Sequence, residues 1–101
     1  MDWLWTRGGT SFGYREVDDL WTPDGRHVGR FHGGEVYGPG GNYLGELEGS
    51  GLLVTNRAKT SKRVNGFEPS PAQSGSGQRS GRAGLAMHGN YEDFPAPEKL
   101  S

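Results

Sequence analysis

Three side chains in one short stretch have the chemistry of metal ligands: Asp24, His27 and His32. A metal site needs three or four such ligands held in a fixed geometry. The equivalent positions of the neighbouring repeats, which are described below, hold other types of residue. We therefore predict ordinary surface histidines and no metal ion.

Nucleophilic catalysis would need a serine or threonine beside a base, with an acid to orient that base. We expect His27 in a turn region and His88 in a mobile tail, and no sequence pattern places a serine beside either of them. The glycines Gly75, Gly77 and Gly81 do not match a dinucleotide fingerprint or a phosphate loop. We predict that the protein is not an enzyme and binds no cofactor.

Aromatic side chains beside arginines form the third candidate site. Trp5, Trp21 and Tyr37 stand sixteen residues apart, and Arg26 and Arg30 are near them in the sequence. If these rings are exposed, they can stack single-stranded nucleic-acid bases or sugars. If they are buried they belong to the core, which is the commoner fate of large aromatic side chains. The sequence leaves both interpretations open.

The sixteen-residue spacing of these rings is part of a longer repeat. Glycine recurs at positions 9, 25 and 41, and an apolar residue followed by glycine recurs at 12–13, 28–29 and 44–45. The fourth copy is degraded, because Arg57 replaces the first glycine and Thr60 and Ser61 replace the apolar–glycine pair.

Each repeat has the pattern of a β-hairpin, with strand-favouring residues on both sides of a glycine turn such as Pro23-Asp24-Gly25. The four hairpins span 3–15, 19–31, 35–47 and 51–64. We predict an all-β domain over 2–65, made of four 16-residue β-hairpin repeats in a closed pseudo-fourfold arrangement, because closure removes exposed sheet edges. The apolar residues within a hairpin, such as Val28 and Phe31, have opposite parity. Either both faces of the strand are partly buried or the strand bends at Gly29 and Gly45, and we favour a bend, because a glycine within a strand commonly marks a bulge.

The aromatic–x–x–Asp/Gly–Gly–x–x–apolar–Gly pattern and the count of four resemble the four-fold beta-flower domain family, over residues 2–64. Members of that family look like small bacterial proteins of unknown function. Several end with a Pro-rich segment and a short aromatic tail, to which Pro69, Pro71, Tyr91 and Phe94 are similar. The resemblance implies a fold and transfers no catalytic residue.

Beyond the repeat, residues 66–84 are rich in glycine, serine and proline and contain almost no apolar side chain, so we predict a disordered linker. The tail, residues 85–101, regains apolar character, and Tyr91 and Phe94 are expected either to dock on the domain or to bind another protein. The densest basic cluster, Arg57, Lys59, Lys62 and Arg63, is interpreted as a charged edge strand, with an anion-binding patch as the alternative.

The charge balance and the distribution of apolar residues limit the classes of function that the protein could have. A chain with 11 basic and 12 acidic residues has no global field that attracts nucleic acid or a membrane. The start of the chain is acidic and aromatic and no apolar run is long enough to span a bilayer, so we expect a cytoplasmic protein without a signal peptide. We predict a non-catalytic binding or assembly module that binds a protein or another copy of itself. A module that stacks nucleic-acid bases or sugars is the alternative.

Overall fold

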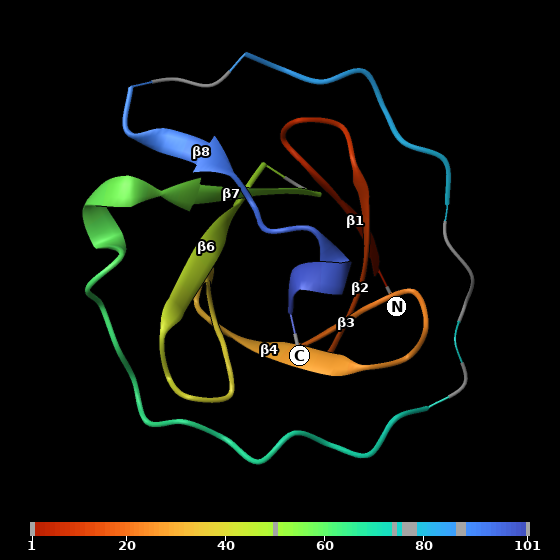
Figure 1. Cartoon of the computed structure of the whole chain (residues 1–101), viewed down its shortest axis with the longest axis vertical. Coiled ribbons are helices and arrows are strands. Elements are labelled where there is room, and N and C mark those ends of the chain that lie inside the picture. The colour runs from red at the N-terminus through yellow and green to blue at the C-terminus, as the bar shows by residue number, and fades with distance from the viewer. Residues whose placement is uncertain (1, 50, 74, 76–78, 87–88, 101) are drawn as a thin grey trace.

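A closed β-barrel surrounds the centre of the molecule, as Figure 1 shows in a view down the shortest axis. The structure is a computed structural model, and it describes residues 2–49, 51–73, 75, 79–86 and 89–100. Over this part of the chain, each strand pairs antiparallel with the next, and a parallel pairing of the first strand with the seventh closes the barrel. The seven strands are β1 (Asp2–Thr6), β2 (Ser11–Glu16), β3 (Asp19–Trp21), β4 (His27–His32), β5 (Glu35–Tyr37), β6 (Tyr43–Glu48) and β7 (Leu52–Asn56).

The second strand of the fourth hairpin, which the sequence predicted to end near residue 64, is not formed. The chain turns after β7 into a short 3-10 helix, η1 (Arg57–Lys59), and an eighth strand, β8 (Tyr91–Asp93), pairs antiparallel with β7 instead. The prediction of eight strands within 3–64 was therefore wrong. Thr60 and Ser61 supply neither the apolar side chain nor the glycine that the other hairpins use at this point, and Phe94 fills the core from the tail.

The predicted irregularity at the glycines is a set of three β-bulges. The register shifts between Leu4 and Trp5, between Leu20 and Trp21, and between Val36 and Tyr37. In each case an extra residue is inserted in the opposite strand directly before a glycine, at Phe12, Val28 and Leu44. A bulge reverses the side-chain alternation, which is why side chains of opposite parity on one strand share the core.

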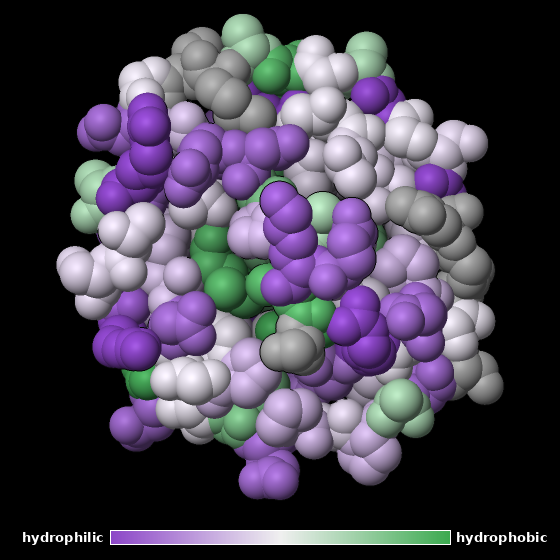
Figure 2. All heavy atoms as spheres, viewed as in Figure 1, coloured by the Kyte–Doolittle hydropathy of each residue, from purple (hydrophilic) through white to green (hydrophobic). Residues whose placement is uncertain are grey.

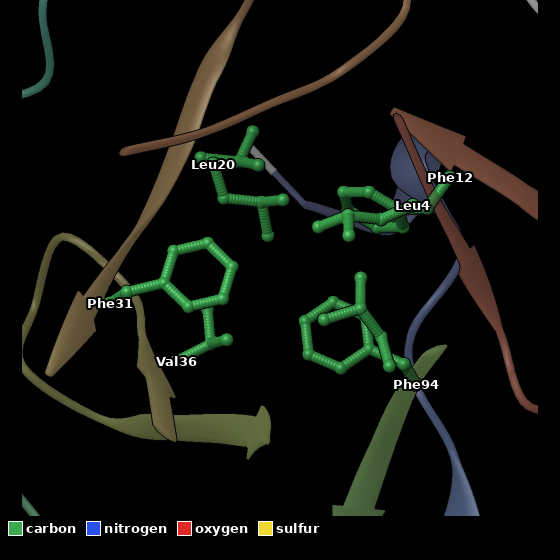
Figure 3. Close-up of a cluster of buried hydrophobic side chains, with 8 residues drawn as sticks. Leu4, Phe12, Leu20, Phe31, Val36 and Phe94 are labelled. Atoms are coloured by element: carbon green, nitrogen blue, oxygen red, sulfur yellow. The ribbon is translucent and has the colours of Figure 1, made fainter. Parts of the chain in front are cut away.

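The core lies inside the barrel, where the side chains from different strands point toward one another (Figure 3). Phe94 is 3% exposed and packs edge-on against Phe12, with ring centroids 5.2 Å apart. Gly45 is needed at this place, because a Cβ there would lie 2.5 Å from Cδ1 of Phe94. The buried cluster consists of Leu4, Phe12, Leu20, Val28, Phe31, Val36, Leu53 and Phe94.

The described residues between η1 and β8 run around the outside of the barrel (Figure 1), and we call those within 64–90 the belt. Its backbone N–H groups at Val64, Gln73 and Arg82 donate to carbonyl oxygens of the three glycine turns, over 2.9, 2.9 and 2.8 Å. The acceptors are, in the same order, Gly41, Gly25 and Gly9. Composition predicted a disordered linker over 66–84, and the structure gives its described residues this course, with most of them exposed.

After β8 the tail turns inward, and a second 3-10 helix, η2 (Pro97–Lys99), lies over one end of the barrel. Pro97 is buried, and Leu100 packs against the core. Figure 2 shows this face, where hydrophobic surface is visible around the centre between hydrophilic side chains. Two shallow pockets, of about 210 and 140 Å³, flank the end of the tail.

Candidate functional site

The second half of β7 has an edge that no other strand of the barrel covers within the described residues, and the tail occupies it. Val54, Thr55 and Asn56 pair with the three residues of β8, Asp93, Glu92 and Tyr91. The carboxylate of Asp93 accepts hydrogen bonds from the backbone N–H of Gly8 and the hydroxyl of Thr6, over 3.0 and 3.3 Å. Main-chain pairing together with a side chain in a pocket is the usual mode by which a sheet edge binds an extended peptide.

Arg26, a predicted binding residue, holds the end of the tail. Its guanidinium donates to the carbonyl oxygens of Leu100 and Pro97, over 2.6 and 3.1 Å, and forms an ion pair with Asp24 at 3.2 Å. Two donors on one planar group fix the direction of the peptide as well as its position. The strand edge, the Phe94 position in the core and Arg26 thus form one continuous binding site for residues 91–100.

The three repeat aromatics, Trp5, Trp21 and Tyr37, lie on the outer wall of the barrel and not in the central core. Trp21 and Tyr37 are buried, whereas Trp5 is half-buried. Their ring contacts, within the described residues, are with neighbours and not with one another: Trp21 stacks between Tyr14 and His27, and Tyr37 packs edge-on against Tyr43 and His32. The indole N–H of Trp21 is buried without a hydrogen-bond partner in the described part of the chain.

The belt covers this outer wall. The guanidinium of Arg82 lies 3.6 Å from the ring centroid of Trp5, and that of Arg79 lies 4.9 Å from the ring centroid of Trp3. The indole N–H of Trp5 donates to the carbonyl oxygen of Ser80 over 2.9 Å. A nucleic-acid base or a sugar that stacks on Trp5 would therefore have to displace Arg82 first.

His27 is fully buried, so the prediction of a surface histidine was wrong at this position. Its Nε2 lies 3.0 Å from Asp19 Oδ1, and its Nδ1 accepts a hydrogen bond from the backbone N–H of Ser70 at 2.8 Å. Arg30, another predicted binding residue, also donates to Asp19 and stacks on the ring of Phe67 from the belt, 4.6 Å from its centroid.

The three candidate metal ligands have separate contacts. Asp24 pairs with Thr22 and Arg26, whereas the ring of the exposed His32 packs against Tyr37. In the part of the chain that the structure describes, no group of three or more His, Cys, Asp or Glu side chains comes together. The Asp19–His27–Ser70 contact resembles a catalytic triad in composition alone, because Ser70 contributes its backbone N–H and not its hydroxyl group.

Two residues of the basic cluster form ion pairs with the barrel. Lys59 lies 3.0 Å from Glu35 and 2.9 Å from Glu46, and Lys62 lies 3.0 Å from Glu35. Hydrogen bonds from Lys62, Tyr37 and Lys59 lower the pKa of Glu35 to about 2. The guanidinium of Arg57 donates to backbone carbonyl oxygens of Gly89 and Asn90 at the start of β8. Lys59, Lys62 and Arg57 therefore bind groups of this chain.

The sequence analysis missed the belt residues that bind the barrel, Phe67, Gln73, Arg79 and Arg82. A signal for them was present: glycine recurs every nine residues in the belt, at 66, 75 and 84. Each of these glycines follows a residue whose amide bonds to a turn of the barrel by two positions. A nine-residue period is easily overlooked in a segment so rich in glycine and serine.

Comparison of the chain with protein families, with curated proteins and with solved structures finds no match. Within the described residues, neither 3-10 helix has the length or the apolar character required to cross a membrane.

Proposed function

We propose that the protein is a non-catalytic binding and assembly module whose barrel binds an extended peptide of the kind found in its own tail. One observation carries this proposal: β8 adds to the free edge of β7 and places Phe94 in the hydrophobic core at 3% exposure. The barrel takes part of its core from a segment that begins 35 residues after the end of β7, and this supports a site suited to an extended peptide.

We also propose that the barrel consists of four sixteen-residue units in a pseudo-fourfold arrangement, with the tail completing the fourth. Three bulges at Phe12, Val28 and Leu44 support three equivalent units. Phe94, which contacts Phe12, takes the corresponding place in the fourth unit, where Thr60 stands in the sequence. This arrangement is compatible with the resemblance to the four-fold beta-flower domain.

The same site can be filled by the tail of the same chain or by the tail of a second copy. The long belt gives the chain's own tail a high effective concentration at the site, which favours the monomer at low protein concentration. A partner protein with an extended segment like Tyr91–Pro97 would compete on the same terms. Self-association and partner binding are therefore two uses of one site.

The experiment that tests this proposal uses the full-length Phe94→Ala variant and a synthetic peptide of residues 90–100. Truncation of a buried Phe costs about 3–5 kcal/mol, so the variant is expected to melt well below the wild-type protein. Because a ligand that binds only the folded state stabilises it, the peptide should raise the melting temperature of the variant in a concentration-dependent way.

The matched control is the same peptide with Ala at position 94, which keeps the strand and lacks the ring. It should stabilise the variant far less, while the wild-type chain should respond weakly to either peptide because its site is filled. If Phe94→Ala does not fold, Phe94→Leu keeps part of the core and allows the same titration. Equal effects of the two peptides would contradict the proposal.

A further inference from the structure

The belt meets the barrel at a second place that has the features of a recognition site, on the outer wall at β1. Two tryptophans of β1, Trp3 and Trp5, each carry a guanidinium of the belt, from Arg79 and Arg82. Both arginines are exposed, so their contact with the rings is not a consequence of burial in the core. Arg79 and Arg82 are three residues apart in the belt, and each lies over one of two rings that stand two residues apart on β1.

Backbone contacts fix the register of the belt at this place. Arg82 N–H donates to Gly9 O over 2.8 Å, Leu85 N–H donates to Arg7 O over 2.9 Å, and the indole N–H of Trp5 binds Ser80 O. A Cβ built at Gly9 would overlap the carbonyl oxygen of Arg82, so glycine is what allows the two backbones to approach. The hydrogen bonds thus hold the backbone of the belt, and the two tryptophan rings contact its arginine side chains.

The comparable turn at Gly25 shows which part of this recognition is general. There the amide of Gln73 donates to Gly25 O as Arg82 does to Gly9 O, and its side-chain amide donates to the hydroxyl of Tyr14 over 2.7 Å. One backbone hydrogen bond, from a belt amide to the carbonyl oxygen of the turn glycine, is common to both turns, but the paired cations on tryptophan are found at Gly9. Arginine stacks on aromatic faces better than lysine because its guanidinium is planar and weakly hydrated.

We propose that the outer wall formed by Trp3, Trp5 and Gly9 is a binding site for extended peptides with two arginines at Arg–x–x–Arg spacing, and that residues 79–85 are its built-in occupant. A cation–π contact at an exposed site is weak. An arginine-rich segment of another protein can therefore compete with the built-in occupant. The site adjoins the tail site, because Thr6 and Gly8, which bind Asp93, lie between Trp5 and Gly9. Its test follows the rings of Trp3 and Trp5, so its failure can be told apart from failure of the function proposed above.

The test removes both guanidinium groups of the built-in occupant in the full-length chain, with Arg79→Ala and Arg82→Ala together, and adds a peptide of residues 78–86. The three indole N–H signals of Trp3, Trp5 and Trp21 are followed by ¹H–¹⁵N NMR. The arginine peptide should shift the Trp3 and Trp5 signals saturably and leave the Trp21 signal in place. The same peptide with lysine at both positions should bind several-fold more weakly, because lysine does not stack as a plane.

Two controls accompany this titration. Gln73→Ala, at the comparable turn, should leave the Trp3 and Trp5 signals unchanged, and the wild-type chain should bind the arginine peptide more weakly than the double variant because its own belt competes. If the double variant fails to fold, Arg82→Ala alone gives the same readout at Trp5. Shifts that do not saturate, or equal binding of the lysine peptide, would overturn the proposal.

Discussion

Val17 has a backbone conformation that valine rarely adopts. It is the first residue of the turn between β2 and β3, its φ is 58°, and its side chain is 84% exposed. Glycine stands at the two positions sixteen and thirty-two residues later, Gly33 and Gly49, with φ values of 64° and 65°. A β-branched side chain at positive φ is a steric outlier, and Val17 makes no compensating contact with the core.

We therefore expect Val17→Gly to stabilise the protein. Relief of the left-handed strain is worth about 1–2 kcal/mol, and the extra freedom of glycine in the unfolded chain takes back about 0.4–1 kcal/mol. The net gain of about 1 kcal/mol should raise the melting temperature by several degrees. Val17→Ala is the control, since it keeps the Cβ and the strain while removing most of the exposed apolar surface. A Val17→Gly variant no more stable than Val17→Ala would show that the turn is not strained.

Among the elements, η1 is tied to β5 and β6 by an ion-pair network that makes stability depend on pH. Lys62, Tyr37 and Lys59 lower the pKa of Glu35 from 4.5 to about 2. Because the pKa is lower in the folded state than in the unfolded state, the stabilisation is fully present above about pH 5 and is lost as the pH falls toward 2. Glu35 remains 20% exposed, so solvent screening limits the effect to about 1 kcal/mol.

The measurement is urea unfolding of the wild type and of Glu35→Gln at pH 6, 4 and 2. The variant should be less stable at pH 6, and the difference should shrink at pH 4 and vanish near pH 2. Glu16→Gln, at the exposed end of β2, serves as the matched control and should change stability little at any of these values. A difference between the wild type and Glu35→Gln that is constant with pH would mean that Glu35 acts through packing and not through its charge.

The strands of the barrel and the tail show how much of the fold the sequence could predict. The all-β class followed from the hairpin pattern, and the bulges followed from the parity of Val28 and Phe31 on either side of Gly29. The identity of the eighth strand did not, because a strand of three residues such as Tyr91–Asp93 carries no periodicity of its own. The degraded pair Thr60–Ser61 marked the place that lacked a strand, and only the three-dimensional closure shows what replaces it.

At the scale of the whole molecule, the belt and the barrel are matched in length. The belt amides that bind the turns, Val64, Gln73 and Arg82, are nine residues apart, and nine residues of extended chain span at most about 30 Å. That is close to a quarter of the circumference of the molecule, which measures 37 by 33 Å along its two longer axes. The composition of residues 66–84 predicted disorder because they contain few apolar side chains that could be buried. A belt held by backbone hydrogen bonds to the turns buries few side chains as well.

A nearly taut belt responds differently to shortening and to lengthening. Deletion of Pro71 and Ala72 removes about 7 Å of chain, so the bonds of Val64 to Gly41 and of Gln73 to Gly25 cannot both form. Insertion of two glycines at the same place leaves enough length for both bonds, at a small entropic cost. Amide hydrogen exchange measures the result directly, since the donors at Val64, Gln73 and Arg82 should all be protected in the wild type.

We expect the deletion to abolish protection at Val64 or Gln73 and the insertion to preserve it, with Arg82 protected in both variants because it lies beyond the change. Equal loss in the two variants would mean that the belt needs a fixed register and not merely a sufficient length. Absence of protection in the wild type would mean that residues 66–84 behave in solution as their composition predicts. In that case the outer wall of the barrel would be open, and the Arg–x–x–Arg site would be available to peptides without competition from the belt.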